Sequence, residues 1–132
     1  MDEIEHAKEW QRFADMDLDS AVHLSNMRPA PIEVICYHCQ QSAEKNLKGY
    51  LILKGILPPR IHDLDELRKM CLKHSAAFED IADTCSDLTA YGIQQRYPLG
   101  PVLEEQDMKK SLKSARTVRD FILSLAPDLK PT

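Results

Sequence analysis

The sequence predicts an all-α protein, an up-and-down bundle of four to five helices. Apolar residues recur every three or four positions along most of the 132 residues, which is the spacing of one helix face. Glycine occurs only 4 times and the 8 prolines lie mostly between the periodic segments, so the turn residues of a β-rich domain are scarce. An apolar content of 43% and this length suit one domain with one core.

The first helix is expected over residues 4–27. Its apolar stripe consists of residues three and four apart: Ala7, Trp10, Ala14, Leu18, Ala21 and Ser25. Asp17 lies at the edge of this stripe, whereas Asp15 and Asp19 are expected to face away. Residues 28–31, Arg-Pro-Ala-Pro, should end the helix, because proline donates no backbone hydrogen bond and disfavours helix in its predecessor.

The second helix is expected over residues 32–54, with Gly55 as its C-cap. Its core stripe consists of Cys36, Cys39, Ala43, Leu47 and Tyr50. About 100° round the helix lies a polar stripe of Tyr37, Gln41, Glu44 and Lys48. Gln40 borders both stripes, and Lys45 flanks the polar one.

The remaining helices are shorter or follow longer connections. Asp63 is expected to cap a third helix, with Glu66 completing a capping-box pattern. A fourth helix is expected over 78–90 and a last one over 104–125, separated by a loop over 91–101. Arg119 falls inside the apolar arc of the last helix, and we expect it to meet Asp17 of the first. One domain over 1–126 should precede a frayed tail over 127–132.

Charge and hydropathy limit the classes of protein and of site. A formal net charge of −4 argues against a nonspecific nucleic-acid surface over the whole molecule, although a local basic cleft is compatible with it. No apolar run reaches the roughly 18 residues of a membrane span, and the acidic N-terminus is unlike a secretory signal. We therefore expect a cytoplasmic protein with reduced thiols and no membrane contact. Cys36 and Cys39 have zinc-like spacing, but they lie on a helical core stripe, so we expect no metal and no cofactor.

Three segments together resemble the HEPN family. Residues 38–48, HCQQSAEKNLK, are similar to its signature H-x-Q-Q-A-x-E-K-x-L-K; residues 61–67, IHDLDEL, are similar to its H-D-L-x-x-L motif. Tyr91 to Pro98 resembles its late R-Y-P loop, and the three motifs occur in the family's order and spacing. The resemblance implies a helical bundle, usually a homodimer, often encoded beside a minimal nucleotidyltransferase. It also implies nucleotide or RNA binding, and several branches of the family are ribonuclease toxins.

The polar stripe of the second helix has two interpretations. It is a solvated face, on which Glu44 and Lys48 form an i,i+4 pair, or it is a binding surface. For binding, Lys45 and Lys48 suit phosphate, and Gln41 suits a base edge or ribose. Tyr37 supplies a ring for stacking.

Two further places also have a structural and a functional interpretation. His62 either simply precedes the Asp63 cap or lies near phosphate and takes part in proton transfer. Arg96 and Tyr97 in the long loop suit phosphate contact and stacking. Alternatively, Arg96 ties the loop to an acidic helix end and Tyr97 fills the core.

Catalysis in ribonuclease members of the family uses R-x4–6-H, usually late in the bundle. Arg68 and His74 have this spacing, but roughly one such pair arises by chance in a chain of this composition. They lie in the expected third helix, about 240° apart, so they would not converge on one phosphate. No histidine follows Arg96. We therefore expect no ribonuclease centre of the usual kind, and we assign no catalytic residue.

The leading hypothesis is a nucleotide- or RNA-binding HEPN module that acts with a nucleotidyltransferase partner in a two-component system, such as a toxin–antitoxin pair. The residues expected to bind are Tyr37, Gln41, Glu44, Lys45, Lys48, His62, Arg96 and Tyr97. Two alternatives stay open: a metal-independent HEPN ribonuclease toxin and a non-catalytic protein-interaction scaffold.

Overall fold

The computed structural model describes residues 2–95 and 102–131, and all regular elements in them are helical. The elements in chain order are α1 (Glu3–Leu24), α2 (Ile32–Leu53), α3 (Leu64–Leu72), η1 (Ala76–Ile81), α4 (Ala82–Gln95), α5 (Glu105–Leu125) and η2 (Pro127–Leu129), where η denotes a 3-10 helix. The predicted all-α bundle is therefore confirmed.

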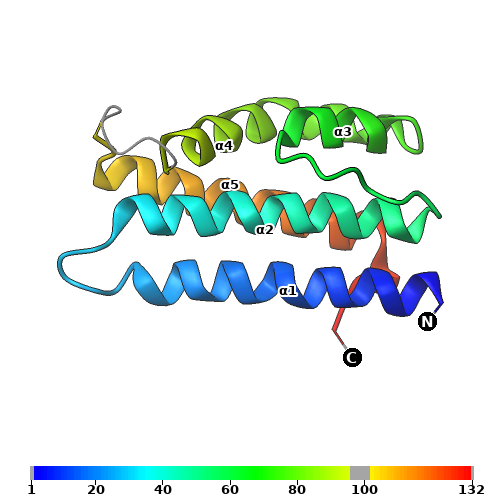
Figure 1. Ribbon diagram of the computed structural model, residues 1–132, viewed down its shortest axis with the longest axis horizontal. Coiled ribbons are helices and arrows are strands. Elements are labelled where there is room, and N and C mark those ends of the chain that lie inside the picture. The colour runs from blue at the N-terminus through cyan, green and yellow to red at the C-terminus, as the bar shows by residue number, and fades with distance from the viewer. Residues whose placement is uncertain (1, 96–101, 132) are drawn as a thin grey trace.

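Helix α2 is the central element of the bundle. It packs against α1, α3, α4 and α5, and its most extensive contacts are with α1. Figure 1 shows α1 and α2 running antiparallel side by side, with α3 and α4 along the other edge of α2 and α5 behind it. The segment between α2 and α3 runs back along α2, so residues 54–63 lie beside that helix rather than beyond its end (Figure 1).

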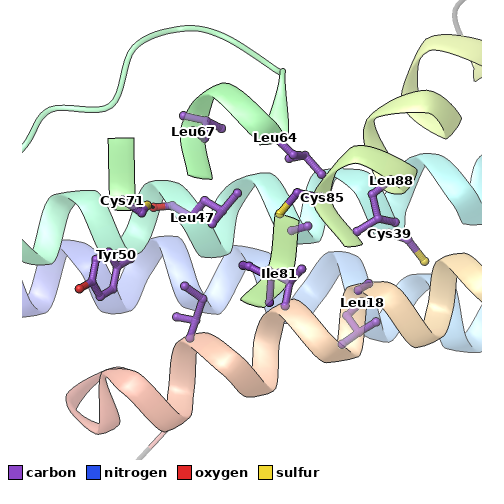
Figure 2. Packing of buried hydrophobic residues seen from close by; sticks show 14 of the residues in the cluster. Leu18, Cys39, Leu47, Tyr50, Leu64, Leu67, Cys71, Ile81, Cys85 and Leu88 are labelled. Carbon is purple, nitrogen blue, oxygen red and sulfur yellow. Dashed lines mark hydrogen bonds between the residues drawn. The ribbon is translucent and has the colours of Figure 1, made fainter. Parts of the chain in front are cut away.

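The core forms where α2 meets its neighbours. Its predicted stripe of Cys36, Cys39, Ala43, Leu47 and Tyr50 is buried, as expected. Figure 2 shows Leu47 next to Cys71, with Leu64, Leu67 and Cys85 close by, and Leu88 beside Cys39. All four cysteines are free and buried, and burial raises the thiol pKa of Cys39, Cys71 and Cys85 to about 12. They behave as small apolar side chains.

The ends of the middle helices follow the expected local rules. The Asp63 side chain accepts hydrogen bonds from the backbone N–H groups of Asp65 and Glu66, which are otherwise unpaired at a helix start. Gly55 follows α2 with φ of +77°, a conformation that favours glycine.

The predicted loop over 91–101 was wrong in its first part, because α4 continues to Gln95. The Tyr91 hydroxyl lies 3.4 Å from Asp107 Oδ1 on α5, so this end of α4 is held against the neighbouring helix. Tertiary contact thus extends a helix whose own apolar spacing fades after Ala90.

The C-terminal segment also differs from the frayed tail that we expected. Residues Pro127–Leu129 form η2, which packs on α1 and α5, and Leu129 is only 1% exposed. The buried apolar side chain of Leu129 anchors the segment. Local sequence rules did not predict this role, because the flanking prolines indicate that helical structure ends here. The boundary of the single domain at residue 126 stays a prediction.

Arg119 pairs with Asp15 rather than with Asp17, so that part of the prediction was wrong. Its Nε atom lies 2.6 Å from Asp15 Oδ1, and Gln11 donates to the same oxygen at 3.0 Å. Asp15 and Asp17 are two residues apart and therefore about 200° apart round α1. Asp15 turns toward α5, whereas Asp17 turns toward the polar face of α2.

Candidate functional site

The polar stripe of α2 faces a groove between α1 and the segment 54–63. Helical geometry places His38 and Lys45 about 20° apart on the side of α2 that meets α1. Glu44 lies about 120° from His38, on the side that meets the segment 54–63, and Gln41 and Lys48 lie between. The groove therefore has two walls, and each wall supplies a histidine and a carboxylate.

The wall toward segment 54–63 carries what we call the loop-side triad: Glu44, Lys48 and His62. Glu44 Oε2 accepts a hydrogen bond from Lys48 Nζ at 3.0 Å, and Glu44 Oε1 lies 3.0 Å from His62 Nδ1. Gln40 Nε2 donates to the His62 carbonyl at 3.0 Å, which ties the segment to α2. The side chains of Glu44 and Lys48 are only 5% and 8% exposed. The i,i+4 pair exists, but its burial contradicts the solvated-face interpretation for these two residues.

The two interpretations of His62 are compatible in this geometry. Asp63 caps α3 while the preceding side chain turns back to Glu44. The carboxylate holds Nδ1 and thereby orients the ring, and the imidazole remains 55% exposed at the groove. His62 thus combines a structural role at the start of α3 with an oriented ring nitrogen, Nε2, that the contact with Glu44 leaves free.

The opposite wall carries the α1-side triad: Asp17, His38 and Lys45. Asp17 Oδ1 lies 3.0 Å from His38 Nδ1, and Asp17 Oδ2 accepts a hydrogen bond from Lys45 Nζ. Of these three residues, only Lys45 was predicted from the sequence as a binding residue. Two features of the sequence could have identified the other two residues. Asp17 lies at the edge of the apolar stripe of α1, and His38 is the first residue of the H-x-Q-Q signature.

Two adjacent hollows open along this groove. The first hollow has a volume of about 490 Å³ and is lined by His6, Trp10, Lys48, Ile52, Leu57, Pro58, Pro59 and Arg60. The second hollow has a volume of about 310 Å³ and is lined by His6, Glu9, Trp10, Phe13 and Lys45. Trp10 lines both, and Lys48 Nζ lies 5.9 Å from the centre of its ring, a cation–π distance. Trp10, expected in the core, is half-buried and belongs to the site instead.

The other predicted site residues are only partly gathered in this groove. Gln41 is half-buried, and its Nε2 donates to Gln40 Oε1 at 2.9 Å, so its own carbonyl oxygen is not committed to that bond. Tyr37 is half-buried, and its ring centre lies 6.3 Å from that of His38. Arg96 and Tyr97 lie outside the described residues.

Arg68, which has the R-x4–6-H spacing with His74, has a structural role. Arg68 is buried, and its guanidinium contacts Asp65 at 2.8 Å and Glu79 at 3.3 Å, so it joins α3 to η1. Burial lowers the pKa of Arg68, whereas the bonds to Asp65 and Glu79 raise it, and the result is a raised pKa. His74 is exposed and lies just beyond the end of α3. The two side chains do not form a site together.

The groove combines cations, aromatic rings and oriented imidazoles, which is the chemistry that recognises phosphate and nucleobases. Residues 38 and 44 are six apart, hence about 9 Å apart along α2 and about 120° round it. His38 and His62 therefore stand on opposite walls and do not form an acid–base pair around a single phosphorus atom.

Fold and groove together define a helical bundle whose central helix carries a partly buried polar site. The chain belongs to the HEPN domain family, which matches residues 7–125. It is similar in structure to TT1696 from Thermus thermophilus, with 22% identity, coverage of 89% of this chain and 96% of that chain, and a TM-score of 0.79. It is also similar to ST0689, an archaeal HEPN homologue, with 23% identity, coverage of 90% and 96%, and a TM-score of 0.69. No curated protein sequence matches the chain.

Within residues 2–95 and 102–131, none of the helices combines the length and the apolar character that crossing a bilayer requires.

Proposed function

We propose that this HEPN domain binds a nucleotide or a nucleotide unit of RNA in the first hollow. One observation carries the proposal: the buried Glu44–Lys48 pair holds Lys48 beside the ring of Trp10, where Lys48 lines a hollow of about 490 Å³. Burying a lysine is costly, and here a carboxylate and an aromatic face offset that cost. The arrangement places a preoriented cation next to a stacking surface, and the volume lies within the range of small-ligand sites.

Each wall of the first hollow would meet a different part of the ligand. The base would stack on Trp10 and contact the apolar surface of Leu57, Pro58 and Pro59. The phosphate would lie between Lys48 and the exposed Arg60. Gln41, two turns before Lys48 on α2, would hydrogen-bond a base edge or ribose hydroxyl. Glu44 would position Lys48 and His62 without touching the ligand.

A nucleotide titration tests this proposal directly. Trp10 is the only tryptophan of the chain, so its fluorescence reports on the hollow that it lines. We expect adenosine 5′-monophosphate to change this fluorescence and, at about 100-fold excess over its Kd, to stabilise the protein by about 2.7 kcal/mol. Arg60→Gln should weaken binding about fivefold by removing one exposed cation, whereas Lys109→Gln, an equal charge change on α5, should not. Unchanged fluorescence and melting with every common nucleotide at millimolar concentration would refute the proposal.

Partner and assembly are proposed from family membership. We expect a cytoplasmic homodimer that acts with a minimal nucleotidyltransferase in a two-component, toxin–antitoxin type of system. Sedimentation of the pure chain, whose protomer mass is 15.1 kDa, tests the dimer. Co-purification with the product of a neighbouring nucleotidyltransferase reading frame tests the partner.

A metal-independent ribonuclease is the second candidate, and the His62–Glu44 contact favours it. A carboxylate that holds Nδ1 leaves Nε2 of the imidazole for proton transfer. This candidate predicts cleavage of RNA in the presence of EDTA, with loss of cleavage in His62→Ala and Arg96→Ala. Intact RNA after long incubation with the pure protein would eliminate it. A scaffold that binds only proteins would show neither cleavage nor nucleotide stabilisation.

A further inference from the structure

The groove repeats one arrangement of side chains. In the loop-side triad, Glu44 bridges the amine of Lys48 and the Nδ1 atom of His62. In the α1-side triad, Asp17 bridges a lysine amine and a histidine Nδ1 atom in the same way. Each triad contributes its lysine to one of the two hollows, and Trp10 lines both hollows.

We infer that the second hollow is a second nucleotide subsite, so that the ligand is a single-stranded oligonucleotide of at least two nucleotides. This inference rests on the proposed function of the first hollow. Lys45 and Lys48 are three residues apart on α2, so their Cβ atoms lie about 5–6 Å apart on neighbouring turns. Two successive phosphates of an extended strand, running along the groove, would each meet one lysine.

The second hollow also has its own stacking surface. Phe13 lines it and is 46% exposed, which is unusual for a large apolar ring. The Arg12 guanidinium lies 4.6 Å from the centre of the Phe13 ring and is paired with Glu9, which lines the same hollow, so Arg12 supports the ring and Lys45 remains the cation of this hollow. A base that enters beside Phe13 would therefore find a ring on which to stack and a lysine for its phosphate.

Charge favours a single strand over a duplex. The whole chain has a formal net charge of −4, and each groove lysine already has a carboxylate partner, so the dense phosphates of a duplex would be repelled. The aromatic rings, moreover, can stack only on bases that are not already paired within a helix. Unpaired bases in a short strand satisfy both conditions.

Trp10 fluorescence distinguishes one subsite from two. The protein is titrated with adenosine 5′-monophosphate, with the dinucleotide ApA bearing a 5′-phosphate, and hence two phosphates, and with the tetranucleotide of adenosine, in ribose and deoxyribose forms. We expect ApA to bind at least about tenfold more tightly than the mononucleotide, because one stacked base contributes about 1–3 kcal/mol. Phe13→Ala should abolish this gain and leave mononucleotide affinity within about twofold.

Met16→Ala is the matched control, since Met16 is an equally exposed apolar residue of α1 outside both hollows. It should keep the ApA gain. Equal affinity for ApA and the mononucleotide, or an undiminished gain in Phe13→Ala, would overturn the second subsite and leave the first intact. A Phe13→Ala variant with unchanged ApA affinity and a changed sedimentation mass would assign Phe13 to a protein interface and also overturn it. Absence of binding by all probes would instead refute the proposed function itself.

Discussion

Glu44 is the residue on which the loop-side triad depends. It contacts Lys48, His62 and Gln40, and it thereby connects the groove to the segment that leads into α3. Its carboxylate is only 5% exposed, and the Lys48 amine and the other hydrogen bonds replace the water that it loses on burial.

Glu44→Gln should therefore destabilise the fold. The amide keeps the shape but removes the charge that balances Lys48, and we expect the free energy of unfolding to fall by about 2 kcal/mol. Urea denaturation measures this change. Glu105→Gln breaks a pair of the same i,i+4 spacing on the exposed surface of α5, and it should leave the midpoint unchanged. Equal effects of the two substitutions would show that burial does not matter here.

The Arg119–Asp15 pair joins the last helix to the first. Both side chains are less than one-third exposed, and the bond to Asp15 raises the pKa of the guanidinium. A double-mutant cycle with Asp15→Asn and Arg119→Gln should give a coupling free energy of about 1 kcal/mol. The cycle is read from urea midpoints of the two single variants and the double variant. Strict additivity would mean that the pair does not contribute to stability.

At the scale of the element, the end of α2 controls how the chain returns along the groove. Gly55 has φ of +77°, and a Cβ atom there would lie 3.2 Å from the flexible carboxylate of Glu3. The steric conflict is thus easily relieved, and the backbone conformation dominates the cost of a side chain.

Gly55→Ala should lower the free energy of unfolding by about 1 kcal/mol. Gly55→Asn should cost less, because asparagine tolerates the left-handed conformation better than alanine does. Thermal melting of the two variants gives the comparison. Alanine at least as stable as asparagine would contradict the assigned role of this glycine.

At the scale of the whole molecule, the buried cysteines couple stability to alkaline pH. Their ordinary pKa is 9.0, and burial in the core raises it to about 12 for Cys39, Cys71 and Cys85. Between these values the unfolded chain loses protons that the folded chain retains, so stability is full below about pH 9 and falls as pH rises toward 12.

Urea midpoints at pH 8 and pH 10.5 should therefore differ, with the lower midpoint at pH 10.5. Cys85→Ala removes one of the titrating thiols and should make the pH dependence shallower, even though it also lowers stability at pH 8. An identical pH dependence in this variant and the parent chain would show that the thiols are not responsible.

Local and periodic signals in the sequence determined most of the architecture. The 3.6-residue period located the helices and the core stripe of α2, and the chemistry of Asp63 and Gly55 located two helix ends. These features depend on residues close together in the chain, so they can be read without knowing the packing. Three ordered motifs likewise indicated the family, which the matched residues 7–125 confirm.

Only the tertiary structure decided which polar groups meet. Asp15 and Asp17 are two residues apart, yet one reaches Arg119 on α5 and the other reaches Lys45 on α2. The burial of Glu44 and Lys48, and the place of Trp10 between two hollows, depend on how the segment 54–63 folds back along α2. Helix periodicity gives the direction of a side chain from its own axis, but the neighbour that it meets depends on the packing of distant segments.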